Sequence, residues 1–453
     1  KPKLLPTMKN LIKWFGVDRG ITYAVSSKVW SLFAGPITLF LISFYLSPEV
    51  QGFYYTFLSL LALQSFVELG FYIVVTQFAS HEWAQLRLDE EGKIVGDPNS
   101  LSRLISLGRL IFKWYLVVSL IFIIAIGSGG YLFLSQQPLP GINWEVPWLV
   151  LVVIAGFQLW VMPFLSLLEG CNQVETVYRF RFIQTVVGSL SAWLVMSLGG
   201  ELWMASASSA AVLLTSLYLV LIRYQNFFRP FFSQKISSVI HWKNEMWPMQ
   251  WRLGVAGLLN YFIYSIYTPV LFHFHGPVSA GKMGMTWTIV MTLSSLAMAW
   301  ISTKVPRFGI LIVEKNYAEL DKLFFRSSIA SLLVICSGAI AFWVFIYGLN
   351  IYKISLAERL LAPFPTFIFL VGICLSQISQ CQTAYLRAHK REPFFVLNII
   401  YSLVNGALVW FLAEKYDSLG AAIGYLASQV FLFLPIGTII WIKCRSKWHK
   451  LNT

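Results

Sequence analysis

The chain has 453 residues, of which 57% are hydrophobic and only 12% are charged, and its mean hydropathy is +0.68. Because a soluble globular domain carries roughly 25% charged residues, this composition excludes an ordinary soluble enzyme and indicates a membrane protein. The formal net charge is +14. The basic residues flank apolar runs and form no separate basic module, so we expect anionic lipid headgroups as their partners and no nucleic acid.

The basic residues follow the order of the apolar runs. Most of the 34 Lys and Arg residues fall in every second gap between these runs, and the intervening gaps hold few. This is the positive-inside pattern of a polytopic helical membrane protein, whose Lys- and Arg-rich connections stay in the cytoplasm. It predicts that both termini are cytoplasmic.

Twelve apolar runs are near or above the roughly 20 residues that a helix needs to cross the hydrocarbon of a bilayer. In chain order, the first six are Ile21–Leu46, Phe53–Ser80, Leu104–Leu134, Val146–Leu168, Phe182–Leu198 and Leu202–Ile222. The second six are Trp247–Phe272, Val278–Ile301, Ser327–Tyr347, Leu360–Leu386, Phe394–Leu412 and Leu419–Ile442. We therefore predict an all-α polytopic membrane protein with twelve transmembrane helices.

A long basic connection divides the chain into halves. Residues 223–246 are predicted to be a cytoplasmic linker between two six-helix bundles, residues 21–222 and residues 247–442. Residues 1–20 and 443–453 are the predicted cytoplasmic ends. Residues 1–7 precede the first methionine, which indicates an added segment.

The two halves share a related turn. Pro48-Glu-Val-Gln-Gly52 follows the first apolar run, and Pro277-Val-Ser-Ala-Gly281 follows the seventh. Because six helices return the chain to the side on which it began, two such copies keep one orientation and are related by an axis along the membrane normal. Transporters built in this way bind substrate between their repeats. We therefore expect two pseudo-symmetric bundles around a central cavity.

Charged residues inside the apolar runs are candidates for a site, because each costs about 2.5–3.5 kcal/mol or more in hydrocarbon and needs a partner or water. Lys28 lies roughly 10 Å into the first run, among Ser27, Ser31 and Gly35. As a functional residue it is a cation that faces the cavity and binds an anionic group of the substrate. The alternative is that it extends back to the cytoplasmic headgroups.

The second run holds Gln64 and Glu68 one helical turn apart, on a stripe that continues through Tyr72 and Thr76. Glu68 falls near the middle of the bilayer, where a carboxyl group is either a hydrogen-bonded packing residue or the partner of Lys28. A further interpretation is that Glu68 couples transport to an ion gradient by gaining and losing a proton. Gln64 is a candidate for hydrogen bonds to substrate.

Further candidates lie in the second half of the chain. Arg252, Asn260 and Tyr264 form a stripe in the seventh run, and we expect them to contact substrate, although Arg252 alternatively anchors the helix at the interface. Gln377 lies in the tenth run within the polar stretch Ser376–Thr383. Polar side chains in such a stretch either hydrogen-bond neighbouring helices or line an aqueous path.

Three more basic residues are secondary candidates. Arg109 and Lys113 are one turn apart in the third run, which is longer than a span requires, so their alternative location is the cytoplasm. Lys282 lies at the outer end of the eighth run, where it meets the departing substrate or extends to the interface.

The chain shows no pattern for metal or nucleotide chemistry. Its five cysteines lack the paired spacing of a zinc site, and His273 and His275 have no further ligand nearby in the sequence. The stretch Gly276–Lys282 matches the start of a phosphate-binding loop, but Met283 replaces the required Ser or Thr and no strand precedes it. We expect no metal ligand, no cofactor and no catalytic residue, so the chain is not expected to be an enzyme.

Two short motifs and the layout point to a family. The turn Leu46-Ser-Pro-Glu-Val-Gln-Gly-Phe-Tyr54 and the motif Glu68-Leu-Gly70 lie in a twelve-run, two-bundle chain that resembles, from Ile21 to Ile442, the polysaccharide flippases of the multidrug/oligosaccharidyl-lipid/polysaccharide (MOP) exporter superfamily, which include O-antigen flippases. The resemblance implies a carrier in the bacterial inner membrane that moves an undecaprenyl-diphosphate-linked oligosaccharide to the outer leaflet by alternating access. It also implies a polysaccharide polymerase machinery as a partner.

The substrate that this resemblance implies fits the polar residues inside the runs. A diphosphate needs cations such as Lys28 and Arg252, and sugar hydroxyls need hydrogen-bonding side chains such as Gln64, Asn260, Tyr264 and Gln377. With no nucleotide-binding motif in the sequence, the energy source is an ion gradient or consumption of the product outside.

Two other classes fit part of the pattern. Multidrug antiporters of the same superfamily also have twelve helices, but they move cations and are expected to have acidic clefts, whereas Lys28 favours an anion. A membrane-embedded glycosyltransferase or polymerase uses lipid-linked sugars, but it needs a sizeable outer loop, and the connections expected on the outer side are short.

Overall fold

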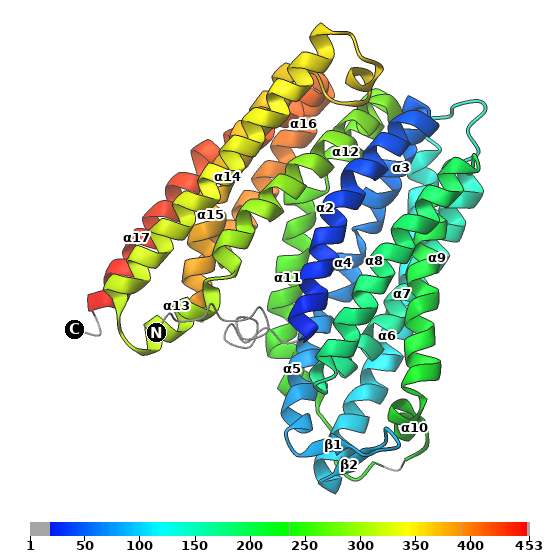
Figure 1. Ribbon diagram of the computed structural model, residues 1–453, viewed down its shortest axis with the longest axis vertical. Helices are drawn as coiled ribbons and strands as arrows, with labels where there is room; N and C mark the ends of the chain where they lie inside the picture. Colours follow the sequence, from blue (N-terminus) through cyan, green and yellow to red (C-terminus); the bar gives the residue numbers. More distant parts are fainter. Residues whose placement is uncertain (1–18, 235, 390, 451–453) are drawn as a thin grey trace, which may run out of the picture. The chain divides into compact units, whose positions relative to one another are not determined.

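The computed structural model describes residues 19–234, 236–389 and 391–450, which are nearly all helical and divide into two compact units (Figure 1). Unit 1 comprises the described residues up to Leu46 together with Leu63–Ser135 and Pro140–Gly257. Unit 2 comprises Ser47–Ala62, Gln136–Leu139 and the described residues from Leu258 onward. The expected segment 1–7, nearly all of 1–20 and the end of 443–453 lie outside the described residues.

Unit 1 is built mainly of long helices that run side by side, with α7 in contact with α5, α6 and α9, and α8 in contact with α2 and α9. Its elements are α2 (Arg19–Tyr45), α4 (Gln64–Glu68), α5 (Phe71–Trp83), α6 (Pro98–Leu134), α7 (Glu145–Gly170), α8 (Val174–Ser197), α9 (Trp203–Tyr218), the π-helical turn η1 (Leu219–Arg223), α10 (Gln225–Ser233), the π-helical turn η2 (Trp242–Met246) and most of α11 (Trp247–Tyr264). The connection before α6 folds into an antiparallel hairpin that we did not predict, β1 (Leu86–Leu88) and β2 (Ile94–Gly96).

Unit 2 contains one helix from the first half of the chain. Its elements are α3 (Pro48–Leu61), the last residues of α11, α12 (Tyr267–Ser302), α13 (Val305–Val313), α14 (Tyr317–Ile351), the short 3-10 helix η3 (Ser355–Arg359), α15 (Pro363–Ala388), α16 (Phe395–Ser428), the π-helical turn η4 (Gln429–Phe433) and α17 (Leu434–Lys450). Phe308, Phe324, Tyr385, Leu397 and Trp441 belong to one buried apolar cluster between these helices.

The described residues contain nine helices that are long and apolar enough to cross a membrane, or ten if the pair α3–α4 and α5, bent by 47°, is one span. Two of the nine, Gln250–Val313 and Phe395–His449, have 64 and 55 residues. Drawn out straight they would reach about 96 and 82 Å at a rise of 1.5 Å per residue, far more than the ~30 Å of hydrocarbon. Each therefore holds two passes.

The chain reverses inside α12 and inside α16. At Gly276 the backbone has φ 80° and ψ −179°, and beyond this point the Trp287 ring lies 4.6 Å from the Tyr267 ring. At Asp417 φ is 52°, and Gly420 lies so close to the Leu412 carbonyl that an added Cβ would be 1.9 Å from its oxygen. The all-α polytopic fold is confirmed, and the two reversals bring ten spans to the predicted twelve passes.

The related turns of the two halves lie against each other within unit 2. Ser47 caps α3 by accepting a hydrogen bond from the Val50 amide at 3.2 Å. A Cβ on Gly52 would lie 1.9 Å from the carbonyl oxygen of Pro277, and one on Gly281 would lie 2.9 Å from the Gly52 nitrogen. Only glycine allows this approach at both positions, so the repeated motif packs against its own copy.

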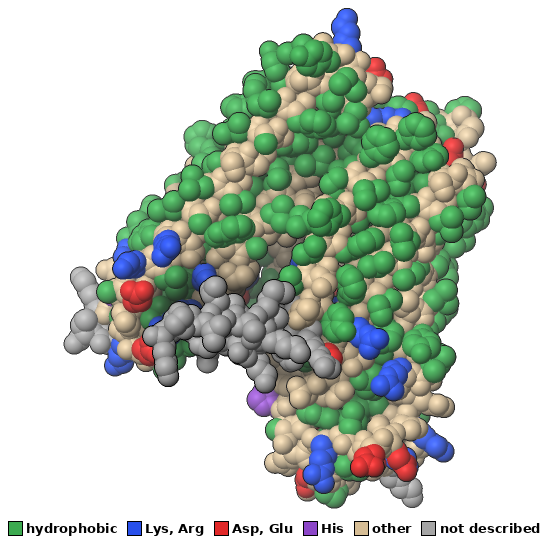
Figure 2. Space-filling view, in the orientation of Figure 1, with side chains coloured by type: hydrophobic (Ala, Val, Ile, Leu, Met, Phe, Trp, Pro, Cys, Tyr) green, Lys and Arg blue, Asp and Glu red, His purple; other side chains and the backbone are tan. Residues whose placement is uncertain are grey.

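The surfaces of both units fit a bilayer. Figure 2 shows hydrophobic side chains along the helices of each unit and Lys, Arg, Asp and Glu side chains gathered near the helix ends. Large apolar side chains are widely exposed; Ile124, Leu333 and Phe411 are 69%, 67% and 64% exposed. In water such exposure favours aggregation, whereas in lipid it is neutral or favourable. The division into bundles 21–222 and 247–442 around a cavity, with the linker 223–246 between them, stays a prediction.

Candidate functional site

Helix α2 presents one packed side, and α8 covers it. The Ser27 and Thr185 hydroxyls are 3.0 Å apart, and the Trp193 indole N–H donates to the Thr38 hydroxyl at 2.8 Å. Hydrogen bonds between helices are a common source of cohesion in spans that pack through small and polar residues. The pairing fixes the rotation of α2 and therefore the direction of every other side chain on it.

Lys28 lies on a flank of α2 next to this packed side. It is exposed, as is Ser31 one turn further on, and a rotation of 100° per residue places Gly35 on the same flank. The opposite flank carries Phe33, Phe40 and Phe44, which are 67%, 64% and 71% exposed. The helix therefore separates a large apolar flank, suited to lipid, from a small polar flank that carries the cation.

The second predicted span, Phe53–Ser80, is broken directly after Glu68. Leu69 and Gly70 both adopt left-handed backbone conformations, with φ 51° and 67°, which end α4 and start α5. Helix α11 packs into this break, because a Cβ on Gly70 would lie 2.6 Å from the Leu253 Cβ. Glu68 precedes the break and Arg252 precedes Leu253, so these two candidates flank one helix contact in unit 1.

Tyr115 of α6 is a polar neighbour of Glu68. Glu68 is half-buried, and α4, which carries it, contacts α6. In the described part of unit 1, the Tyr115 hydroxyl is buried without a hydrogen-bond partner. The broken helix therefore lies next to a buried hydroxyl that is able to donate to a carboxylate.

The stripe predicted on the seventh run is divided between the two units. Arg252, in unit 1, is exposed, and its guanidinium lies 5.6 Å from the centre of the Trp251 ring. Asn260 and Tyr264 belong to unit 2, where Asn260 is exposed and the Tyr264 carbonyl accepts a hydrogen bond from Trp287 at 2.6 Å. Their joint action on a substrate stays a prediction.

Gln377 connects three helices of unit 2. Its side chain is fully buried, donates to the Ser331 hydroxyl of α14 at 2.7 Å and accepts from the Ser294 hydroxyl of α12 at 3.3 Å. These contacts are those of an interhelical packing residue. Contact with sugars remains a prediction for Gln377.

The secondary basic candidates differ in their surroundings. Arg109 donates from Nε to the Phe231 carbonyl at 2.6 Å and also to the Gln234 carbonyl. It therefore satisfies carbonyls at the C-terminal end of α10, where a cation is also favoured by the helix dipole. Lys113 is exposed and Lys282 is half-buried.

A charged cluster in unit 1 was not predicted from the sequence. Arg181 of α8 donates to the Glu169 carboxylate of α7 at 2.9 Å, and the Tyr72 hydroxyl of α5 donates to the same oxygen. The Arg181 guanidinium also lies 5.1 Å from the centre of the Tyr178 ring. The pair went unnoticed because we placed Arg181 in a connection and ended the fourth run one residue before Glu169. The available signal was an acidic and a basic residue on either side of a short turn between two helices.

Solved transporters have a similar fold. A multidrug resistance MATE family transporter of the MOP superfamily in its inward-facing conformation is 14% identical over 96% of both chains, with a TM-score of 0.62. Such a transporter in the outward-facing conformation is 13% identical over 97% of this chain and 98% of that one, with a TM-score of 0.56. The lipid II flippase MurJ, inward closed, is 13% identical over 94% and 87%, with a TM-score of 0.56.

No family model and no curated protein matches the sequence. Among the described residues, no group of three or more His, Cys, Asp and Glu side chains is arranged to hold a metal ion. The likeness to the solved transporters covers nearly the whole chain. The chain therefore has the fold of the MOP superfamily transporters.

Proposed function

We propose that the chain is a flippase that moves an undecaprenyl-diphosphate-linked oligosaccharide from the inner to the outer leaflet of the bacterial inner membrane. The observation that carries the proposal is the cation of Lys28 on the small polar flank of α2, opposite a flank of exposed Phe side chains. A lysine that only extends to headgroups needs no such polar flank. A lysine that receives a diphosphate does.

The chemistry of the substrate explains the remaining candidates. A diphosphate brings charge that hydrocarbon does not tolerate, so the carrier replaces its water with cations, here Lys28 and Arg252. The sugars need hydrogen-bonding groups, which Gln64 and Asn260 offer from α4 and α11. The polyprenyl tail stays in lipid, and a polymerase machinery receives the delivered oligosaccharide.

A proton or cation at Glu68 is the proposed coupling element. The carboxyl group stands at the end of α4, where the left-handed Leu69 and Gly70 interrupt the helix. A change of charge at a helix break alters the hydrogen bonding of the freed backbone groups and so favours one of two helix arrangements. Glu68→Gln is expected to transport without dependence on the proton gradient; unchanged dependence would remove Glu68 from the mechanism.

A carrier of organic cations is the second candidate, because the multidrug transporters share the fold equally well. A cation carrier needs an acidic cleft, and Glu68 is the acidic residue that α4 offers. Replacing Lys28 separates the two functions, since loss of this positive charge weakens the binding of an anion and strengthens the binding of a cation.

The test uses purified full-length protein in proteoliposomes loaded with a fluorescent undecaprenyl-diphosphate oligosaccharide. Lys28→Ala is expected to abolish translocation and Lys28→Arg to retain part of it, whereas Lys322→Ala, which removes an exposed lysine from α14, is the matched control. Normal translocation by Lys28→Ala at a normal protein level would reject the proposal. Uptake of an organic cation that rises in Lys28→Ala would replace it with the antiporter.

A further inference from the structure

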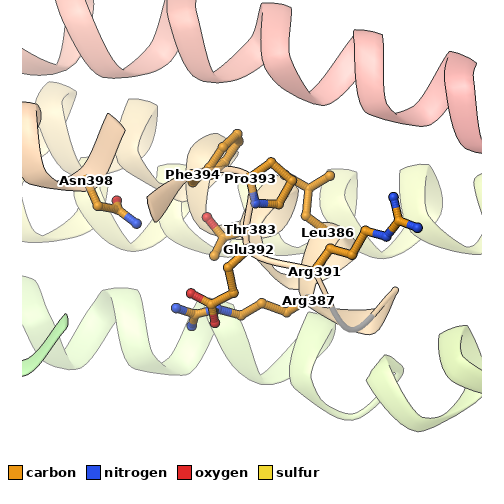
Figure 3. A pocket seen from close by; sticks show the side chains of 8 residues that line it. All are labelled: Thr383, Leu386, Arg387, Arg391, Glu392, Pro393, Phe394 and Asn398. Carbon is orange, nitrogen blue, oxygen red and sulfur yellow. The ribbon is translucent and has the colours of Figure 1, made fainter. Parts of the chain in front are cut away.

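A shallow hollow lies in unit 2 where α15 ends and α16 begins (Figure 3). Its lining is Thr383, Leu386, Arg387, Arg391, Glu392, Pro393, Phe394 and Asn398. Leu386 and Phe394 are buried and form the apolar part of its wall, whereas both arginines are exposed. The hollow thus combines an apolar wall with two cations, close to the end of the candidate span Pro363–Ala388.

The ion pair at the hollow is weak enough for an anionic ligand to replace its carboxylate. Nε of Arg387 lies 3.1 Å from a carboxylate oxygen of Glu392, and their side chains are 55% and 53% exposed. An ion pair this exposed contributes little to stability, so a stronger anion displaces the carboxylate at little cost.

Arg391 is held by a different contact. Its guanidinium lies 5.4 Å from the centre of the Trp448 ring. Stacking on an aromatic ring leaves the N–H groups of the guanidinium in its own plane, where they remain able to donate to an oxyanion. The two positive charges are therefore held in different ways: Arg387 by an ion pair and Arg391 by an aromatic ring.

The hollow ends a polar stripe on α15. Ser376, Gln380, Thr383 and Arg387 follow each other at helical spacing and share one face, and Gln380 donates to the Ser376 hydroxyl at 3.3 Å. A basic residue that only fixes the helix at the interface requires neither this stripe nor an adjoining hollow.

We propose that the hollow binds a phosphate group carried by a lipid. Arg387 donates to the phosphate oxygens as Glu392 turns away to make room, and Arg391, whose side chain extends away from Arg387 (Figure 3), adds positive charge at the rim of the hollow. The Asn398 amide donates to a further oxygen, while Leu386 and Phe394 contact the carbon chain next to the phosphate. The ligand is either an anionic phospholipid or a polyprenyl diphosphate, because both present the same group at the bilayer surface.

The full-length protein in detergent is titrated separately with phosphatidylglycerol, undecaprenyl diphosphate, phosphatidylcholine and inorganic phosphate, and bound lipid is counted by native mass spectrometry. The double variant Arg387→Gln/Arg391→Gln is expected to lose about tenfold or more in affinity for the anionic lipid, since charge-assisted hydrogen bonds are the stronger kind. The matched control Arg307→Gln/Arg326→Gln removes two exposed arginines from α13 and α14 of the same unit and is expected to bind normally.

Glu392→Gln removes the competing carboxylate and is expected to bind the anionic lipid more tightly, which a folding defect cannot imitate. Binding of phosphatidylglycerol alone assigns the hollow to a phospholipid, and binding of undecaprenyl diphosphate alone assigns it to a polyprenyl lipid. The proposal is overturned if the hollow variants and the control lose affinity equally, or if neither lipid responds. It is independent of Lys28 and therefore of the transport test.

Discussion

Two polar clusters of the molecule are held together in different ways. In unit 1, Arg181 and Glu169 form a half-buried ion pair between α7 and α8, and unit 2 has a similar pair, Arg445 and Asp321. The cluster around Gln377 in unit 2 is neutral, and its hydrogen bond to Ser331 is fully buried. Losing one member of a charged pair leaves an uncompensated charge, whereas losing a neutral partner leaves one unmet hydrogen bond. Loss of one partner should therefore cost more stability in the Arg181–Glu169 pair than in the neutral cluster around Gln377.

The largest effect is expected for Glu169→Ala. It leaves the Arg181 guanidinium without its carboxylate and the Tyr72 hydroxyl without its acceptor. The full cost of about 3–5 kcal/mol applies to a buried pair; the Arg181 side chain is 35% exposed, so we expect about 2 kcal/mol after solvent screening. Unfolding by denaturant in detergent measures the loss.

The double variant Glu169→Leu/Arg181→Met is the control for this prediction. It removes both charges and keeps most of the volume, so it should recover most of the lost stability. If the double variant is as unstable as Glu169→Ala, the charge itself is not the cause and the contrast between the charged pair and the neutral cluster fails.

A smaller effect is expected in unit 2 for Gln377→Leu. The substitution keeps a similar volume but leaves the Ser331 and Ser294 hydroxyls without their partner on α15. We expect a loss of about 1–2 kcal/mol. A loss larger than that of Glu169→Ala, measured by the same unfolding assay, would reverse the comparison.

A still smaller effect is expected for Tyr401→Phe, which removes only a hydroxyl group from a neutral hydrogen bond in unit 2. This hydroxyl accepts a hydrogen bond from the Gln429 amide at 2.7 Å, and both residues are buried. The expected loss of stability is about 1 kcal/mol. The exposed Tyr416 of α16 gives the matched control, because Tyr416→Phe should leave the unfolding midpoint unchanged.

The number of passes could be predicted from the sequence, whereas the break in the second span could not. The twelve passes follow from length and hydropathy, because an apolar helix of about 20 residues has few stable places other than a bilayer. The break after Glu68 was not predicted, since hydropathy is continuous through Leu69 and Gly70 and says nothing about a left-handed backbone. Gly70 was the signal, because glycine adopts positive φ at no steric cost.

The residues of the candidate site show the same limit. Polar residues inside apolar runs are visible in the sequence, so Lys28 and Gln377 could be singled out, but their surroundings could not. Helix rotation decides that Lys28 is exposed and that Gln377 is buried, and rotation depends on packing between helices. Arg181 was missed because we placed it in a connection, where basic residues ordinarily face water, whereas α8 already begins at Val174.

The smallest effect is expected outside the spans, where charges pair in contact with water. The His241 amide donates to Glu245 at 2.9 Å and Arg103 donates to it at 2.8 Å, and these contacts hold the pKa of the Glu245 carboxyl below its ordinary value. A lowered pKa in the folded state stabilises the fold above the ordinary glutamate pKa, and this contribution disappears as the pH falls through the lowered value.

Glu245→Gln should therefore reduce stability by about 0.5 kcal/mol at pH 7, since the pair is well hydrated. The difference between the wild type and the variant should vanish at a pH below the lowered pKa. Thermal unfolding of both proteins from pH 7 downward measures it. A difference that stays constant with pH would mean that hydrogen bonding by the Glu245 side chain, which Gln reproduces only in part, stabilises η2 and that the carboxylate charge does not. A difference as large as that of Glu169→Ala would show that burial adds nothing to a charged pair in this chain.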